Sequence, residues 1–286
     1  MRRLLFSLLI AGLTASAQPK EQAKGKQDYN KPFPPHKIAG NVYYVGSELL
    51  ATFLIVTPQG NILINSDFEA TVPVIRAAVE KIGFKFSDTK ILLGSHAHGD
   101  HMEGDALLKE YTGAQVMAME QDVPALRAMR PGGKEHPIDK VLKDGDKVTL
   151  GGTTLTAHLT AGHTKGCTTW SLQTTEAGRT LDVVIVCSVG VNAGVALVNN
   201  AGYPEIVDDY RKSFAKLRTM KADVFLGAHG VFYNLTDKYA LLEKGGANPF
   251  IDSKALGAYV DRMEQAFNTN LSNQQQGKGT GKGKGK

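Results

Sequence analysis

Cysteine is scarce in this chain: Cys167 and Cys187 are the only two among 286 residues. If the chain is exported to oxidising surroundings, they are consistent with a single disulfide. A long hydrophobic run is also missing. The apolar stretch Leu4–Leu13 is much shorter than the roughly 20 residues that a transmembrane helix needs. The sequence therefore gives no support for stable insertion into a membrane.

The N-terminal segment is typical of a secretory signal peptide. Arg2-Arg3 forms a positive start, Leu4–Leu13 is the apolar stretch, and Ala15–Ala17 is a small-residue cleavage site,. Residues 1–17 are therefore predicted to be removed on export, which indicates a periplasmic or secreted protein; the paired arginines leave a twin-arginine route open. Residues 18–35 are polar and contain four prolines, which predicts an extended N-terminal arm.

The chain has little net charge outside its two ends. The formal charge of +5 becomes −1 when two arginines of the signal peptide and four lysines of the C-terminal end are left out. The predicted folded body therefore offers no basis for binding nucleic acid. Residues 273–286 are rich in Gly and Lys and are predicted to be a disordered tail; contact of this tail with an anionic surface is the alternative. The excluded residues are Arg2, Arg3, Lys278, Lys282, Lys284 and Lys286.

Apolar periodicity predicts strands and helices in alternation, which favours a layered α/β fold in one domain over residues 36–272. Two αβ halves are expected to face each other, with the candidate ligand loops at one sheet edge. Strands are predicted at Val42–Val45, Thr52–Thr57, Asn61–Asn65, Ile91–Leu93, Gln115–Met119, Lys147–Leu150, Thr153–Leu159, Thr168–Gln173, Leu181–Cys187 and Val224–Leu226. Helices are predicted at Thr71–Ile82, Gly104–Tyr111, Ile206–Leu217, Leu235–Lys244 and Ser253–Leu271.

Potential metal ligands are concentrated in one short segment, His96-Ala97-His98-Gly99-Asp100-His101, directly after a predicted buried strand. His96 and His98 are two apart, so on an extended segment they would point the same way. His163 and His229 lie in Gly-rich turns farther along the chain. Three ligands and an open solvent position characterise a catalytic zinc ion. We expect two ions, one held by His96, His98 and His163 and the other by Asp100, His101 and His229.

The other histidines are more simply interpreted as ordinary polar residues, because a single histidine in a loop is usually not a metal ligand. They are His36, His136 and His158. A solvent molecule shared by two zinc ions would be a nucleophile near neutral pH, since bound zinc lowers the pKa of water to about 7.

The order His-x-His-x-Asp-His, then Gly162-His163-Thr164, then His229 resembles the metallo-β-lactamase superfamily. The resemblance implies a four-layer αβ/βα sandwich with a zinc centre between the halves. Three features are similar to the third subclass of class B β-lactamases, over roughly residues 32–271. They are His101 as a protein ligand, the segment Ala161–Trp170, and the two later segments Tyr203–Ile206 and Gly246–Asp252.

This resemblance implies a zinc-dependent β-lactamase, in which a zinc-bound hydroxide attacks the lactam carbonyl. Asp100 would then be catalytic, because it helps to hold the second zinc ion and orients the nucleophile. Ser188 and Asn192 stand at positions that face substrate in the subclass. Lys165 replaces a proline and Gly190 replaces a hydroxyl-bearing residue, so the preferred β-lactam is left open.

Cys187 has two interpretations. In the first subclass a cysteine near this point binds the second zinc ion as a thiolate. Here His101 already supplies that ligand, so the resemblance favours a Cys167–Cys187 disulfide.

Two other kinds of function remain as alternatives. One is a different exported metallo-hydrolase on the same fold, a lactonase or a thioesterase, and the other is a non-catalytic zinc-binding protein. The relevant hydrolases carry a metal-bridging Asp after a strand in the second half, whereas the matching segment Ile185–Gly190 has no acid. Oligomeric state and zinc occupancy are left open by the sequence.

Overall fold

The computed structural model describes residues 28–277. The predicted signal peptide and most of the predicted tail lie outside the described residues. Two sheets and seven α-helices make up the described chain. The helices are α1 (Val72–Lys81), α2 (Gly99–Met102), α3 (Asp105–Thr112), α4 (Val123–Ala128), α5 (Ile206–Thr219), α6 (Leu235–Glu243) and α7 (Ala255–Gln275). Short 3-10 turns are η1 (Glu69–Thr71), η2 (Phe86–Asp88), η3 (Glu120–Asp122), η4 (Pro131–Gly133) and η5 (Gly230–Phe232).

The first sheet contains seven strands in the order of the sequence. The first four strands are antiparallel, and the pairs from the fourth to the seventh are parallel. These strands are β1 (His36–Ala39), β2 (Val42–Tyr44), β3 (Phe53–Thr57), β4 (Gly60–Ile64), β5 (Thr89–Leu93), β6 (Gln115–Met119) and β7 (Lys140–Leu142).

The second sheet contains five strands in the order β12-β11-β10-β9-β8. All its pairs are antiparallel except β11 with β12. These strands are β8 (Lys147–Leu150), β9 (Thr153–Leu159), β10 (Thr168–Glu176), β11 (Arg179–Val186) and β12 (Val224–Gly227).

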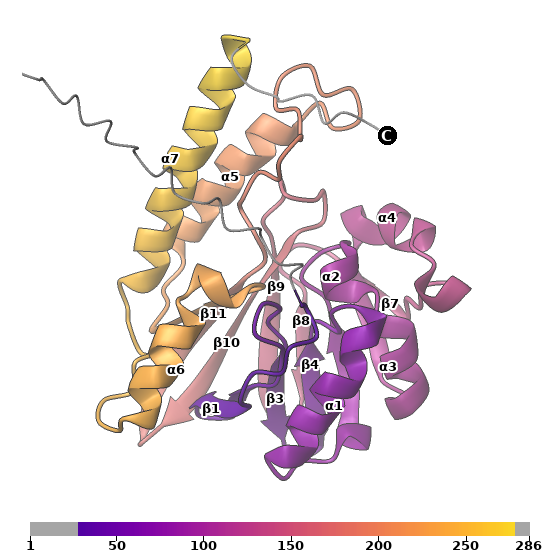
Figure 1. Ribbon diagram of the computed structural model, residues 1–286, viewed down its shortest axis with the longest axis vertical. Helices are drawn as coiled ribbons and strands as arrows, with labels where there is room; N and C mark the ends of the chain where they lie inside the picture. Colours follow the sequence, from indigo (N-terminus) through magenta and orange to yellow (C-terminus); the bar gives the residue numbers. More distant parts are fainter. Residues whose placement is uncertain (1–27, 278–286) are drawn as a thin grey trace, which may run out of the picture.

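The two sheets pack face to face and helices cover their outer sides, so the layers follow the predicted αβ/βα order (Figure 1). Strand alternation explains this. On β3, Leu54 packs under α1 and α3, while Phe53 and Ile55 face the core between the sheets. The indole N–H of Trp170 on β10 donates to the carbonyl of Gly94, 3.1 Å away, and so ties the second sheet to the end of β5.

Some elements differ from the sequence-based prediction. The strands β1 and β7 and the helices α2 and α4 were not predicted. The two helices have at most six residues, so no helical periodicity can repeat within them. The helix α7 continues past its predicted end at Leu271, because the Gln274 side chain bonds to the backbone of Val195 and Leu197. The predicted start of the tail at residue 273 thus falls inside α7.

The described end of the predicted arm packs on the folded body. Phe33 is buried against Tyr44 and Tyr239, and Pro32 forms a bridge with Ser47. Within residues 28–277, no helix combines the length and apolar character needed to cross a membrane.

Candidate metal centre

The predicted ligands meet where several strands of the two sheets end. The segment from His96 to His101 follows β5, and His229 follows β12. His163 lies in the loop between β9 and β10. Strand ends at one edge of an α/β sheet are a common place for ligand sites, because the loops there are free to carry polar side chains.

The first triad consists of His96, His98 and His163. Their ligand atoms lie within 4.8 Å of one another. The ring centroids are 4.7 Å apart for His96 and His98, 4.7 Å for His96 and His163, and 4.9 Å for His98 and His163. Three separate rings therefore point into one small space.

The second triad consists of Asp100, His101 and His229. The Nε2 atoms of the two histidines are 3.2 Å apart. Asp100 Oδ2 lies 3.3 Å from His101 Nε2 and 3.7 Å from His229 Nε2. All three donor atoms thus face one another.

The two triads border each other. His96, Asp100 and His101 also have ligand atoms within 4.8 Å of one another, and the rings of His96 and His101 are 4.2 Å apart. The structure therefore brings together all six residues that the sequence predicted as ligands.

In two of the five imidazoles, a hydrogen bond at Nδ1 fixes which nitrogen faces the centre. His163 Nδ1 lies 2.7 Å from the carbonyl oxygen of Gly190, and His229 Nδ1 lies 3.3 Å from that of Leu49. A carbonyl only accepts, so Nδ1 carries the hydrogen in both rings and Nε2 keeps its lone pair. A backbone carbonyl on the second ring nitrogen is the usual way in which proteins orient a metal-binding histidine.

The donor set fits a divalent metal ion. His96 Nε2 is buried and has no hydrogen-bond partner among the residues that the structure describes, which is costly unless another group binds it. Burial, together with the neighbouring imidazoles, holds the pKa of His96 well below its ordinary value. Burial likewise lowers the pKa of His163 to about 4 and that of His229 to about 4. Neutral imidazoles are the form that binds metal.

Asp100 supplies the negative charge of the second triad. Burial alone would raise the pKa of its carboxyl group, but the hydrogen bond from His101 and the adjacent imidazoles lower it below the ordinary value. Asp100 is therefore ionised at neutral pH and can act as a ligand or as a hydrogen-bond acceptor.

The predicted extended geometry of His96 and His98 is wrong. The backbone N–H of His98 donates to the carbonyl of His96 over 2.8 Å, so the chain makes a tight turn at Ala97. This turn, and not strand alternation, brings the two rings together.

Gly162 explains how His163 reaches the centre. Its φ of +134° is unfavourable for other residues, and a Cβ there would lie 2.7 Å from the ring of Tyr210. The Tyr210 hydroxyl also donates to the Gly190 carbonyl, 2.8 Å away. The same carbonyl that orients His163 is thus held from α5.

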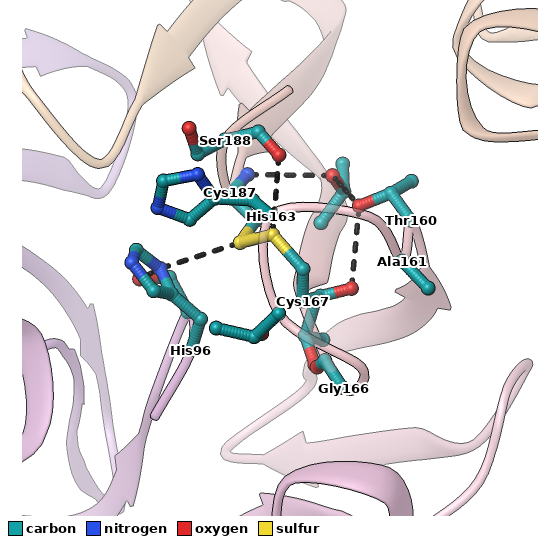
Figure 2. The surroundings of a disulfide bond; sticks show 12 residues. His96, Thr160, Ala161, His163, Gly166, Cys167, Cys187 and Ser188 are labelled. Carbon is teal, nitrogen blue, oxygen red and sulfur yellow. Dashed lines mark hydrogen bonds between the residues drawn. A yellow bond between two sulfur atoms is a disulfide. The ribbon is translucent and has the colours of Figure 1, made fainter. Parts of the chain in front are cut away.

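Cys167 and Cys187 form a disulfide, with their Cα atoms 5.8 Å apart. It joins the start of β10 to the end of the neighbouring strand β11, directly behind the first triad (Figure 2). Cys187 Sγ lies 3.4 Å from His96 Nδ1, and Ser95 Oγ lies 3.1 Å from the same nitrogen. The oxidised sulfur is not available as a thiolate ligand, so the disulfide interpretation of Cys187 is the one the structure supports.

The two predicted substrate contacts differ in exposure. Ser188 is buried, and its Oγ accepts the N–H of Gly190 at 3.3 Å. Asn192 is exposed in the loop that follows.

The three histidines left outside the site have other partners. His36 Nδ1 bonds to the carbonyl of Pro34, His158 Nε2 lies 2.7 Å from Ser171 Oγ, and His136 contacts Asp105 and the carbonyl of Met102. Their interpretation as ordinary polar residues is consistent with these contacts.

Sequence reasoning missed the polar residues that support the ligand loops. Asn65 accepts the N–H of Ser95 and donates to the carbonyl of Ala51. The backbone N–H of Asp67 donates to the carbonyl of His101. Burial and the charge of Asp100 raise the pKa of Asp67 to about 8, although a hydrogen bond from Thr52 acts to lower it. The sequence did contain a signal for Asn65 and Asp67, because polar residues directly after the apolar run of a buried strand often lie at a functional site.

Known proteins share the fold of this chain. The metallo-beta-lactamase superfamily model matches residues 51–229. The native FEZ-1 metallo-beta-lactamase from Legionella gormanii is 48% identical, with a TM-score of 0.84, over 87% of this chain and 99% of that chain. BJP-1, a subclass B3 metallo-beta-lactamase of Bradyrhizobium japonicum, is 38% identical, with a TM-score of 0.79, over 87% of this chain and 97% of that chain. This chain therefore belongs to the metallo-β-lactamase superfamily.

A shorter similarity points to another activity. The hydroxyacylglutathione hydrolase of Cereibacter sphaeroides is 37% identical over 94 residues, which is 33% of this chain. The match spans 32% of the length of that curated relative. Membership of the superfamily implies a divalent metal ion, typically zinc.

Proposed function

We propose that this protein is an exported β-lactamase that uses two zinc ions to hydrolyse the amide bond of β-lactam antibiotics. The observation that carries this proposal is the pair of bordering triads, in which six donors converge from three loops. The similarity to the FEZ-1 enzyme over nearly its whole length supports the lactamase branch.

His96, His98 and His163 would hold one ion, and Asp100, His101 and His229 the other. When bound, zinc supplies a water with a pKa of about 7 and polarises a carbonyl oxygen. Three protein ligands per ion leave a position open for substrate or solvent, as catalytic sites require.

Asp100 is the proposed catalytic residue. Its carboxylate lies at the border of the triads, facing His101 and His229, and it is ionised for the reasons given above. From this position it can accept a hydrogen bond from the attacking water and so orient the oxygen lone pair toward a lactam carbonyl.

Asn192 is the better candidate for contact with substrate, because its side chain is exposed while Ser188 is buried within its own turn. Ser188 would then act by shaping the turn that carries Gly190 and Asn192. Export from the cell, with removal of residues 1–17, remains part of the proposal and rests on the sequence pattern.

Thioester hydrolysis is the second candidate, because the curated relatives matched over a third of the chain are hydroxyacylglutathione hydrolases. The strand end that should carry their bridging carboxylate carries the disulfide cysteine Cys187 instead. Asp182 lies in the middle of β11, in an ion pair with Lys221, and Asp209 accepts the hydroxyl of Tyr203. Neither carboxylate belongs to the two triads.

Hydrolysis of a chromogenic cephalosporin and of a hydroxyacylglutathione thioester should be compared side by side, with and without a chelator. We expect chelator-sensitive turnover of the cephalosporin and much slower turnover of the thioester. Thioester turnover without lactam turnover would favour the second candidate. Tight zinc binding without turnover of either substrate would indicate a non-catalytic zinc protein.

A further inference from the structure

Asp122 lies behind the first triad and is not one of its ligands. It is the last residue of η3, just after β6, and its side chain is 3% exposed. Within residues 28–277 no lysine or arginine forms an ion pair with it. A buried carboxylate without a cationic partner needs strong hydrogen bonds to be tolerated.

Both oxygens of Asp122 accept hydrogen bonds from the two loops that carry the first triad. Oδ2 accepts the backbone N–H of Ala97 at 2.9 Å, between His96 and His98. The same oxygen accepts the hydroxyl of Thr164, next to His163, also at 2.9 Å. Oδ1 accepts the backbone N–H of Gly166 at 2.7 Å. One carboxylate therefore joins the β5 loop to the β9–β10 loop.

The second loop is shaped to admit this carboxylate. A Cβ on Gly166 would lie 2.6 Å from Asp122 Cγ and 2.5 Å from Asp122 N, which real contacts do not allow. Only glycine lets the backbone come close enough for its N–H to reach Oδ1. Asp122 thus joins both loops that supply the first triad. Of the two loops that supply the second, its hydrogen bonds reach only the β5 loop, which also carries Asp100 and His101, and not the loop of His229.

We infer that Asp122 is a positioning residue that sets the metal affinity of the first triad and has a much smaller effect on the second, because only the first triad draws ligands from both loops that Asp122 joins. The inference rests on the ligand assignment of the proposed function. The carboxylate holds the His96–His98 turn and the His163 loop in one relative position, and it places a negative charge behind three neutral donors. Residues that orient metal ligands in this way typically contribute 10- to 100-fold in affinity, in order of magnitude about 1 to 3 kcal/mol.

Two substitutions test the inference: one changes the carboxylate itself, and the other removes only one of its hydrogen bonds. Asp122→Asn keeps one oxygen acceptor but turns an NH2 group toward N–H donors. Thr164→Val removes one hydrogen bond and keeps the shape of the side chain. Thr164→Ser retains the hydroxyl and is the matched control.

Each substitution should be made in two backgrounds, so that the triads are measured separately. His229→Ala leaves the first triad complete, and His163→Ala leaves the second complete. The zinc dissociation constant is then measured for each protein by competition with a chromophoric chelator at fixed pH. Thermal unfolding of each zinc-free protein records changes in stability.

We expect Asp122→Asn to weaken zinc binding about 10- to 100-fold in the His229→Ala background and less than about two-fold in the His163→Ala background. Thr164→Val should weaken only the first triad, by a smaller factor, and Thr164→Ser should restore its affinity. An equal loss in both backgrounds, or no loss in either, would overturn the inference. If Asp122→Asn does not fold, Thr164→Val decides between the same outcomes.

Failure of the inference can be told apart from failure of the proposed function. The readout is zinc affinity, which is measured whether or not the protein hydrolyses a lactam. A wild-type protein that binds zinc but leaves lactams intact would contradict the proposed function and would leave the affinity comparison valid.

Discussion

The two triads are built from different chemistry and held in different ways. The first has three imidazoles and no charge of its own, with the buried carboxylate of Asp122 behind it. The second contains its carboxylate, Asp100, among the donors. Each site thus has one negative charge, but only in the second triad can that charge reach solvent or substrate.

The supports of the two triads also differ. In the first triad, the disulfide sulfur of Cys187 contacts His96, and the Gly190 carbonyl accepts a hydrogen bond from His163. Behind the second, Ser66 Oγ donates to Asp105 at 2.6 Å, and Asp105 lies 3.2 Å from His136 Nε2. The backbone N–H groups of Ser66 and Asp67 donate to the carbonyl of His101. The loop that carries His101 is thus held by a series of buried polar contacts, which runs through Ser66 and Asp105 to His136 in the loop before β7.

The largest expected effect comes from removing one ligand of each triad. His163→Ala and His229→Ala should each lower the number of bound zinc ions by one and reduce cephalosporin turnover by more than about 100-fold, because each ion would lose one of only three protein ligands. Metal content after dialysis and initial rates measure both effects. His158→Ala is the control outside the site, and an equal loss of metal there would contradict the separation into two triads.

His136 tests the support of the second triad. Its Nδ1 lies 3.1 Å from the carbonyl of Pro137, and its Nε2 faces the Met102 carbonyl and Asp105. All these partners only accept, so both nitrogens carry hydrogen and the ring is cationic. His136→Leu leaves the Asp105 charge buried without its partner, and we expect a loss of about 3 kcal/mol in unfolding free energy.

The loss from His136→Leu should depend on pH. Burial lowers the pKa of His136, but the hydrogen bond and charge of Asp105 outweigh it and raise the pKa above its ordinary value of 6.5. When the pKa of a histidine is higher in the folded than in the unfolded state, its protonation stabilises the fold. This contribution is complete at a pH below the pKa of the unfolded state, and it is lost as the pH rises through the pKa of the folded state. Denaturant unfolding should therefore show a larger wild-type advantage at about pH 6 than at about pH 9. A difference that grows with pH would refute the cationic ring, and Asp105→Asn in the variant should recover part of the loss.

The disulfide tests the support of the first triad. The double variant Cys167→Ser with Cys187→Ser removes a crosslink between residues 20 apart in sequence. Chain-entropy arguments give a loss of about 3 kcal/mol for a loop of this size. Because Cys187 also contacts His96, zinc affinity should fall at the first triad and stay constant at the second. Denaturant midpoints measure the change in stability, and zinc dissociation constants in the His229→Ala and His163→Ala backgrounds measure the change at each triad. Unchanged stability would exclude a structural role for the disulfide.

The smallest expected effect concerns substrate. Asn192→Ala should raise KM for a cephalosporin by about three- to ten-fold with little change in kcat, since a single neutral hydrogen bond contributes about 1 kcal/mol. Steady-state kinetics measure it, with Asn199→Ala in the same loop region as the control. A fall in kcat alone would place Asn192 outside the substrate contacts proposed for it.

The sequence predicted the ligands better than it predicted what holds them. The six donors are recognisable because His96 to His101 are adjacent in sequence, and His163 and His229 stand beside glycines. Asp122 and the Asp105–His136 pair could not be predicted in this way. The hydrogen-bond donors of Asp122 lie 25 to 44 residues from it in sequence, and Asp105 and His136 are 31 residues apart. Such contacts exist only once the strands have assembled. The turn at Ala97 was missed because a local backbone hydrogen bond replaced the extended geometry.

The most direct test of a two-zinc lactamase is a zinc titration of the metal-free protein in which bound metal and cephalosporin hydrolysis are measured on the same samples. We expect uptake of two equivalents of zinc and full activity only with both triads intact. Saturation of both triads with no hydrolysis of the lactam bond, or full hydrolysis in the absence of any divalent metal, would contradict it.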